Sequence, residues 1–265
     1  MSFTIVTAFF DIGRENWTIS PRSINDYFIN FEGYFHQPYK QILFLDDKYI
    51  DKLNELRAKY KNDTHLTVIP INEVWLKNNI WCWNLLERET QIMNSEYFKN
   101  LIKHRNTVPE TVFPKYTLIN HAKIDFICYS IKNNLINDEL IAWSDFGCCK
   151  IPENLFRVFD FNKIDKNKIN ICLYNDLDIK DTDIIYTILN APVKVTGGFY
   201  IGNKSLFNDY QQLYHKILLY FQHNDLADDD QHIMLRCYYE YPSLFKLHNM
   251  HGIWHLFYKF FEKIT

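Results

Sequence analysis

The sequence lacks a hydrophobic run long enough to cross a membrane as a helix. No window of it approaches the roughly 18 consecutive apolar residues that a membrane-spanning helix requires. Its start, MSFTIVTAFFDIG, has no basic flank and no small-residue cleavage site, so it does not read as a secretory signal. We therefore expect a cytoplasmic protein without a transmembrane segment. The aromatic stretch 254–261 is interrupted by Lys259, which allows at most a peripheral contact with a membrane surface.

Glycine is scarce as well, with 7 among 265 residues. A chain so poor in glycine places each one where the backbone needs its freedom or its small size. Three of the seven, Gly197, Gly198 and Gly202, fall within six positions after an apolar run. That stretch is therefore a candidate for a special backbone geometry.

Neither sign of charge is in large excess, since 29 Lys and Arg stand against 32 Asp and Glu. The net charge of -3 gives no basic surface for a polyanion, so we expect no nucleic-acid partner. The six cysteines have neither the spacing of a zinc motif nor the density of a disulfide scaffold. We expect them to be reduced and buried, including the adjacent pair Cys148 and Cys149, whose disulfide would be strained.

The sequence does contain an alternation of apolar runs and amphipathic stretches. Residues 3–10, 41–45 and 66–71 predict strands, and residues 23–35 and 49–60 predict the helices between them. Strands that alternate with helices form a parallel sheet with helices on both faces. The sequence therefore predicts an α/β fold with a doubly wound, mainly parallel sheet.

The remaining segments extend this pattern without a linker or an internal repeat. Residues 74–105 are long, helical in pattern and rich in tryptophan, which predicts a helical insertion over the sheet. Further elements are expected at 116–133 (helix), 140–143, 169–174 and 193–203 (strands) and 204–222 (helix). We expect a single domain over residues 1–265.

Ligands of doubly wound sheets bind beyond the carboxyl ends of the strands. The residues at and just after the ends of the first two predicted strands are therefore candidates for the nucleotide end of a pocket. They are Thr7, Ala8, Phe9, Arg14 and Asp46.

The apolar strand 140–143 ends abruptly in Ser144 and Asp145. A carboxylate in such a place is costly to bury unpaired, so it should meet a cation, a metal ion or a set of donors. Lys123, on the preceding predicted helix, is a candidate partner, and Gly147 allows a ligand to approach closely. The structural alternative is that Asp145 only caps a turn.

Gly197 and Gly198 allow the backbone to approach a sugar or a phosphate, or else form a bulge in a strand. Their spacing matches neither a dinucleotide fingerprint nor a P-loop. The acidic run 228–230 is typical of a helix N-terminus. Because it follows the glycine-rich stretch, Asp229 and Asp230 are candidate catalytic carboxylates.

His248, His251 and His255 are spaced by three and four residues and would share one face of a helix. Gly252 weakens a helix there, so a complete three-histidine zinc site is less expected than a single metal ligand. No nucleophile-elbow sequence surrounds a serine or a cysteine, which disfavours a hydrolase.

Together these residues resemble the HtrL/YibB family, found in bacterial surface-polysaccharide loci and generally placed with the GT-A type glycosyltransferases. The likeness runs in order along the chain. It is carried by 4–14, by Pro114–Tyr116 with Lys123, by Trp143–Gly147, and by Gly197–Phe199 with Asp229–Gln231.

The resemblance implies a GT-A-like, metal-dependent glycosyltransferase of the hexosyltransferase class, acting in polysaccharide biosynthesis. Its donor would be a nucleotide sugar, with a UDP-sugar favoured, and its acceptor a glycan, a lipid-linked molecule or a protein. The nucleotide would lie in a half formed by about residues 1–105, and the metal and acceptor in a half formed by about 106–265. The resemblance leaves the oligomeric state open.

The resemblance also implies site residues. Mn²⁺ or Mg²⁺ would be held by Asp145 with His251, and catalysis would involve Lys123, Asp229 and Asp230. The donor would further contact Ser144, Gly197 and Gly198, besides the residues at the ends of the first two strands.

This sequence departs from the D-x-D pattern, because Gly147 stands where a second aspartate is expected. The metal would then have fewer protein ligands than usual. A non-catalytic nucleotide- or carbohydrate-binding protein on the same fold is therefore the alternative. A nucleotidyltransferase would need a glycine-rich basic first loop, of which only Gly13 and Arg14 are present.

Overall fold

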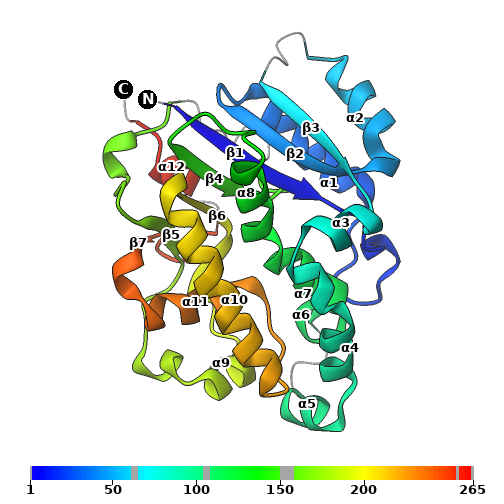
Figure 1. Cartoon of the computed structure of the whole chain (residues 1–265), viewed down its shortest axis with the longest axis vertical. Helices are drawn as coiled ribbons and strands as arrows, with labels where there is room; N and C mark the ends of the chain where they lie inside the picture. The colour runs from blue at the N-terminus through cyan, green and yellow to red at the C-terminus, as the bar shows by residue number, and fades with distance from the viewer. Residues whose placement is uncertain (1, 61–64, 104–107, 150–157, 255–256, 264–265) are drawn as a thin grey trace.

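The structure, a computed structural model, describes residues 2–60, 65–103, 108–149, 158–254 and 257–263. Its centre is a seven-stranded sheet with strand order β3-β2-β1-β4-β6-β5-β7 (Figure 1). The strands are β1 (Phe3–Phe9), β2 (Lys40–Asp46), β3 (Leu66–Ile71), β4 (Leu140–Ser144), β5 (Ile169–Leu173), β6 (Val195–Asn203) and β7 (Phe245–Asn249).

Most neighbouring strands of this sheet run parallel. β1 pairs in parallel with β2 and β4, β2 with β3, and β5 with β7, whereas β6 is antiparallel to both β4 and β5. The predicted α/β class, the mainly parallel sheet and the strands at 3–10, 41–45, 66–71 and 140–143 are confirmed. The parallel strands β1 and β4 lie side by side, so their carboxyl ends meet at one edge.

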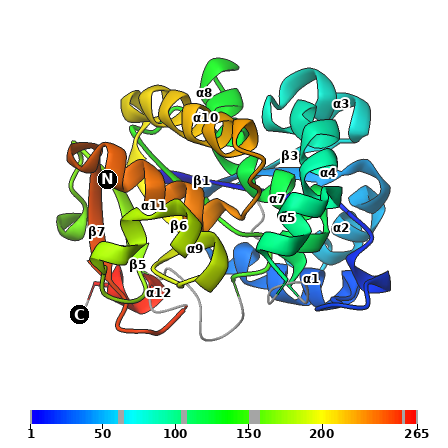
Figure 2. The same ribbon diagram turned by 90° about the horizontal axis from the view of Figure 1, so that it is seen from below.

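Helices cover both faces of the sheet because buried side chains alternate along each strand. In β1, Val6 joins the core under α8, while Ile5 and Phe9 join the core under α1. Figure 2 shows α8 and α10 on one side of the sheet and α1 and α12 on the other.

The helices sort by the core that receives their buried apolar residues. On the α8 side are α3 (Glu73–Asn79), α4 (Leu86–Asn94), α5 (Glu96–Leu101), α7 (Pro114–His121), α8 (Lys123–Lys132), α9 (Ile184–Asn190), α10 (Phe207–His223) and α11 (Asp230–Glu240). On the α1 side are α1 (Ile24–Phe31), α2 (Ile50–Arg57) and α12 (Phe257–Phe260). The short α6 (Pro109–Val112) precedes α7.

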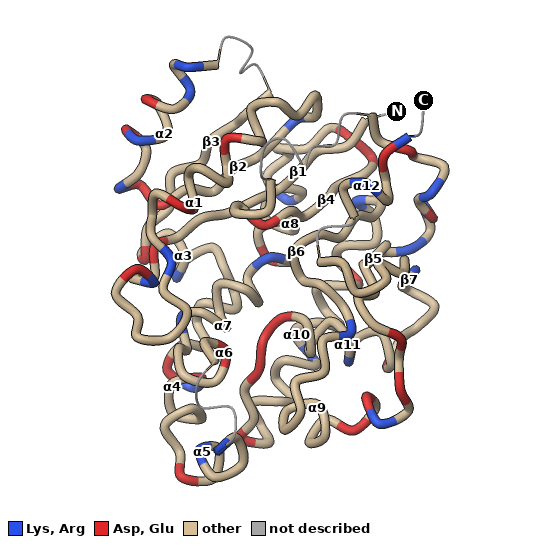
Figure 3. The backbone as a smooth tube through the Cα atoms, turned by 180° about the vertical axis from the view of Figure 1, so that it is seen from behind, with Lys and Arg blue, Asp and Glu red and all other residues tan. Residues whose placement is uncertain are grey.

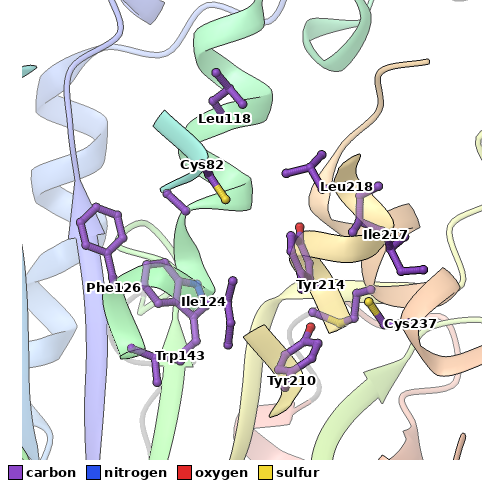
Figure 4. Packing of buried hydrophobic residues seen from close by; sticks show 14 of the residues in the cluster. Cys82, Leu118, Ile124, Phe126, Trp143, Tyr210, Tyr214, Ile217, Leu218 and Cys237 are labelled. Atoms are coloured by element: carbon purple, nitrogen blue, oxygen red, sulfur yellow. The ribbon is translucent and has the colours of Figure 1, made fainter. Parts of the chain in front are cut away.

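The α8-side core joins the sheet to the helical insertion. Figure 4 shows Phe126 of α8 and Trp143 of β4 on one side of this core, and Tyr210 and Tyr214 of α10 on the other. The predicted insertion over residues 74–105 forms α3, the 3-10 helix η4 (Cys82–Leu85), α4 and α5 over its described part. Its buried residues complete the same core, which explains the tryptophan-rich pattern.

The helix predicted over 116–133 is wrong in one respect, because it is two helices, α7 and α8, that meet at Ala122. The sequence has no glycine or proline there to break a helix. The residues on either side of Ala122 make buried polar contacts with different elements. His121 Nδ1 lies 2.8 Å from the Tyr214 hydroxyl, and Lys123 Nζ lies 2.8 Å from Asp230 Oδ2. Tertiary contacts therefore accompany the break.

The histidine-rich tail does not form the helix that would bring three histidines to one face. His248 belongs to strand β7 and bonds Asn170, whereas His251 occupies a turn with a φ of 50°. His255 lies outside the described residues. An extended strand followed by a turn separates His248 from His251, so the spacing of three does not place these two on one helical face.

Within the described residues, no helix combines the length and the apolar character that a membrane span needs.

Candidate functional site

Asp145 follows β4 directly, at the edge of the sheet where β1 also ends. Its Oδ1 accepts a hydrogen bond from Trp143 Nε1 at 2.7 Å and lies 3.0 Å from Lys123 Nζ. Its backbone N–H donates to the Gly198 carbonyl at 3.0 Å, which continues the pairing of β4 with β6. The side chain is 35% exposed, so part of it faces solvent while Oδ1 is held.

Lys123 is the buried centre of this arrangement. Besides Asp145, its ammonium contacts Asp230 Oδ2 at 2.8 Å and donates to the Gly197 carbonyl at 3.1 Å. Burial lowers the pKa of Lys123, but the charges of Asp145 and Asp230 outweigh it and hold that pKa above its ordinary value. The three contacts match the three N–H groups of an ammonium. Lys123 therefore organises its neighbours and has no donor left for a ligand.

Asp230 is the first residue of α11, in the acidic run that Figure 3 shows as a continuous red stretch. Burial raises the pKa of Asp230 to about 6, with Lys123 lowering it and the nearby Asp229 and Asp145 raising it. With Asp145 and Asp230 ionised and Lys123 protonated, the group carries a net negative charge. We call Lys123, Asp145 and Asp230 the α8–β4 ion cluster.

Gly197 is required by this cluster. A Cβ atom at that position would lie 2.0 Å from Asp230 Oδ2, so only glycine lets the carboxylate rest against β6. The register of β5 against β6 also shifts at this point, between Ile171 and Cys172. The glycine-rich stretch is thus an irregular strand segment that makes room for Asp230 and offers its carbonyl to Lys123.

Lys123 and Asp145 line a cavity of about 430 Å³ at the carboxyl ends of β1 and β4. Ala8, Phe9 and Arg14, predicted from the ends of the first strands, also line it. The other polar and aromatic lining residues include Asp11, Arg22, Tyr27, Asn30, Tyr116, Asn120, Trp143 and Trp254. The cavity therefore combines two carboxylates, Asp11 and Asp145, with two arginines and several aromatic rings.

The two arginines are held in different ways. Arg14 donates to the Ser20 carbonyl at 3.0 Å and to the Tyr27 hydroxyl at 3.1 Å, and its guanidinium lies 5.3 Å from the centre of the Tyr116 ring. Arg22 lies over the Tyr27 ring at 5.2 Å. The sequence analysis did not identify Arg22. Its only signal in the sequence is that it is a basic residue in the segment after the first strand. Both guanidiniums can meet an anion at the cavity.

Several predicted residues lie behind the cavity wall. Thr7 is fully buried in the sheet. Asp46 is also buried, and it accepts hydrogen bonds from the backbone N–H groups of Asp11 and Lys48, both at 3.2 Å. Ser144 accepts from the Tyr34 hydroxyl at 2.8 Å. These three shape the strand ends and the loops that follow them.

A second cavity of about 570 Å³ lies beside the first, at the ends of β1, β2 and β3. The two cavities share Phe10, Asp11 and Ile12 as lining residues. Asp46 and Lys115 line the second cavity. The two cavities are therefore neighbours along the same edge of the sheet.

Asp229 is the N-cap of α11. Its Oδ1 accepts from the backbone N–H of Gln231 at 3.1 Å, and its Oδ2 accepts from the Gln231 side chain at 2.9 Å. With Asp228 and His232 it forms one of the groups of potential metal ligands, and His232 Nδ1 lies 2.8 Å from Asp228 Oδ2. The structure thus gives Asp229 a capping role that any catalytic role would have to accommodate.

The fit of a metal ion at Asp145 depends on few donors. Asp145 Oδ2 takes no hydrogen bond from the described part of the chain, so this oxygen is available to a hard cation. His251 is exposed and is not among the described residues that line the cavity, although Trp254 is. The arrangement suits a cation shared between one carboxylate oxygen and the phosphates of a ligand.

Comparison with known proteins gives a family, a relative and similar solved structures. The model of a family described as a bacterial protein of unknown function, HtrL_YibB, matches residues 1–263. Protein HtrL of Escherichia coli strain K12 is 28% identical over 277 residues, covering 100% of this chain and 94% of HtrL.

Among solved structures, mouse xyloside xylosyltransferase 1 in its apo form is similar with a TM-score of 0.49 and 11% identity. The match covers 94% of this chain and 85% of that one. The 4-diphosphocytidyl-2C-methyl-D-erythritol synthase of Anaerococcus prevotii DSM 20548 has a TM-score of 0.42 and 13% identity, over 94% and 87% of the two chains. On the match to its family model, the chain belongs to the HtrL_YibB family.

Proposed function

We propose that this protein is a glycosyltransferase that moves a sugar, of the hexosyl class, from a nucleotide-sugar donor to a hydroxyl group. A UDP-sugar is the favoured donor, and a glycan, a lipid-linked molecule or a protein is the acceptor, in the synthesis of a polysaccharide. The observation that carries the proposal is Asp145, half-exposed at the end of β4 in a cavity with Arg14 and Arg22. Carboxylates and two guanidiniums around one cavity suit a metal-associated diphosphate.

The arginines supply the direct grip on phosphate. A guanidinium matches a phosphate group with two parallel hydrogen bonds, and these charge-assisted bonds are the stronger kind. Arg14 is already oriented by Tyr27 and the Ser20 carbonyl, so less conformational freedom is lost when it binds. Tyr27, Tyr116 and Trp254 present rings to the same cavity and can stack on a base or a sugar.

Mn²⁺ or Mg²⁺ is proposed to bind with the donor. Asp145 Oδ2 would hold the cation, which, when bound, neutralises the charge of the leaving diphosphate. Trp143 and Lys123 fix the carboxylate through Oδ1, which leaves Oδ2 without a hydrogen bond from the described residues. Lys123 and Asp230 are thus positioning residues, and Gly197 makes room for them.

The proposal is tested by a thermal-shift screen of nucleotide sugars with and without Mn²⁺. Because one carboxylate oxygen is a weak metal site by itself, donor and metal should each bind better in the presence of the other. We expect a shift for one donor that exceeds the sum of the shifts for nucleotide alone and metal alone. A ligand at about one hundred times its dissociation constant stabilises by roughly 2.7 kcal/mol, which a thermal shift resolves.

The variant Asp145→Asn keeps the shape and removes the charge. It should abolish transfer and the metal dependence of donor binding, measured by isothermal titration. Because Asp145 is paired with Lys123, we also expect a stability loss of about 1 kcal/mol in urea unfolding. Asp225→Asn, a change in an exposed carboxylate paired with Arg88, is the matched control.

Metal-stimulated transfer that survives in Asp145→Asn would overturn the assignment of Asp145. Tight donor binding by the wild type without turnover on any acceptor would instead favour the non-catalytic binding protein, for which the glycine at position 147 in place of a second aspartate is the supporting observation.

A further inference from the structure

A second cluster of charged and nucleophilic groups lies on the other side of α8 from the cavity. Asp125 of α8, Cys82 of η4 and His215 of α10 each present a possible metal-ligand atom, and these atoms lie within 4.8 Å of one another. His215 Nε2 is 2.7 Å from Asp125 Oδ1. Figure 4 shows the Cys82 side chain in the core between α7, α8 and α10.

The environment holds the three side chains in place. Asp125 Oδ2 accepts from the backbone N–H of Cys82 at 2.9 Å, and Asp125 Oδ1 accepts from Gln211 Nε2 at 2.7 Å. The ring of Trp81 stacks on His215 at 3.9 Å with an interplanar angle of 22°. Ligands that are oriented before a metal arrives lose little freedom on binding it.

The donor set identifies the kind of metal. A thiolate is a soft ligand that disfavours Mg²⁺, Ca²⁺ and Mn²⁺, whereas sulfur, imidazole nitrogen and carboxylate oxygen together suit Zn²⁺. Tetrahedral ligands at about 2.0–2.3 Å from a zinc ion lie roughly 3.3–3.7 Å apart. The observed 2.7 Å between Asp125 and His215 would have to open by about 0.6 Å, and a pair at the 4.8 Å limit of the cluster would have to close by about 1.1 Å.

Of the three side chains, Asp125 also lines a neighbouring cavity. A cavity of about 500 Å³ is lined by Asp125, Trp81 and Gln211. Water from this cavity can complete a tetrahedral shell, as can the oxygen of Gln211 after rotation of its amide.

We propose that Cys82, Asp125 and His215 form a zinc site that joins the helical insertion to α8 and α10. The site is separate from Asp145 and its metal, and it stands whether or not the chain transfers a sugar. Binding releases the proton of the Cys82 thiol. Because Asp125 Oδ1 is a carboxylate acceptor, the proton between it and His215 lies on Nε2, and it must leave Nε2, with the ring keeping one proton on Nδ1, before His215 coordinates through Nε2 as neutral imidazole. Burial and the charge of Asp125 raise the pKa of that thiol, so the proton stays on sulfur until zinc replaces it.

Cobalt substitution provides the test. The full chain, stripped of metal with a chelator, is titrated with Co²⁺ alone and its near-ultraviolet and visible absorption is recorded. We expect a thiolate-to-cobalt charge-transfer band that saturates at one equivalent and disappears when Zn²⁺ is added. Cys82→Ser should remove the band, and the half-buried Cys128→Ser, which changes a thiol lining the same cavity, should retain it.

His215→Gln provides a second variant, because His215 is partly exposed and its replacement leaves the core intact. It should raise the dissociation constant for Co²⁺ at least tenfold and blue-shift or weaken the visible absorption bands. The proposal is overturned if the wild type shows no thiolate band, or if the band persists in Cys82→Ser or is lost in Cys128→Ser. If Cys82→Ser does not fold, the wild-type band and its response to His215→Gln decide the question.

Discussion

The two sides of α8 bury charge in opposite ways. Lys123 places a cation between the carboxylates of Asp145 and Asp230, whereas Asp125, two residues later, places a carboxylate among hydrogen-bond donors from η4 and α10. Both side chains are almost fully buried. The Lys123 side reaches a large cavity through Asp145, and the Asp125 side reaches a separate one.

This difference shows that burial of a charge alone does not mark a functional residue. Each buried charge is compensated, but with different consequences. Around Lys123, two carboxylates surround one ammonium, so the ion cluster carries a net negative charge. Asp145 Oδ2 accepts no hydrogen bond from the described residues, so it can bind a cation. Around Asp125, the hydrogen-bond partners include Cys82 and His215, so a thiol, an imidazole and a carboxylate lie close together. Removing a charge, moving a backbone atom or changing pH should therefore affect the two sides differently.

The largest expected effect is on the α8–β4 ion cluster. Lys123→Met removes the cation and leaves Asp145 and Asp230 without it, one of them fully buried. We expect a loss of about 3–5 kcal/mol in the free energy of unfolding, measured with urea at neutral pH. Adding Asp230→Asn should recover part of this loss, because it removes the stranded charge.

Lys115→Met is the control for that experiment. Lys115 pairs with Glu73 at 2.5 Å on the surface, where such pairs contribute about 0–1 kcal/mol. Equal losses in the two lysine variants would contradict the view that the buried ion cluster holds α8 to β4 and α11.

A third buried carboxylate, Glu89, sharpens the comparison through pH. Burial raises its pKa from 4.5 to about 7, while its partners are the neutral side chains of Gln222 and Thr117. Between about pH 4.5 and 7, the folded protein keeps a proton on Glu89 that the unfolded chain releases. Stability from this group is therefore present at low pH and is lost as pH rises through this window, by roughly 3 kcal/mol.

Glu89→Gln, which mimics the protonated form, should flatten that part of the stability profile. Urea midpoints of the wild type and the variant, measured from pH 4.5 to pH 8, should diverge as pH rises, with the variant the more stable at pH 8. Parallel profiles would show that Glu89 does not titrate in this range. Asp230 is unchanged in both proteins and cancels in the difference.

A change of geometry without a change of charge should have an intermediate effect. Gly197→Ala puts a methyl group 2.0 Å from Asp230 Oδ2, so Asp230 or β6 must move away from Lys123. We expect a loss of about 1–3 kcal/mol in unfolding free energy. In Gly147→Ala, whose added Cβ would meet its nearest atom at 3.6 Å, the change should stay within about 0.5 kcal/mol. Equal changes in unfolding free energy in the two variants would contradict the requirement for glycine at position 197.

The smallest expected effect concerns the open side of the cavity. Arg14→Ala removes one guanidinium that faces the proposed diphosphate, while the ion cluster stays intact. The dissociation constant for the nucleotide should rise about tenfold, or roughly 1.4 kcal/mol by isothermal titration. Arg88→Ala, which removes a surface guanidinium paired with Asp225, should leave it unchanged. If the dissociation constant is unchanged in Arg14→Ala, Arg22 and not Arg14 binds the phosphate.

Sequence patterns were sufficient for the parts of the fold that local physics governs. Alternating apolar runs and amphipathic stretches predict β1, β2, β3 and β4 and the parallel sheet they form, because burial on both faces makes such strands continuously apolar. The same patterns place Asp145 and Arg14 at strand ends, where the cavity is found. The family likeness points to Lys123, Asp230 and Gly197. The sequence does not show that these three residues contact one another.

Tertiary structure alone decided how these residues meet. It set the break between α7 and α8 at Ala122, where no residue disfavours a helix, and so brought Lys123 against Asp230, 107 positions away. It buried Thr7 in the sheet, placed Asp46 at the second cavity rather than the first, and left His251 off both. It also assembled Cys82, Asp125 and His215 from three elements whose spacing matches no metal motif. Side-chain contacts between distant segments depend on how layers pack, and a linear pattern of hydrophobicity does not carry that information.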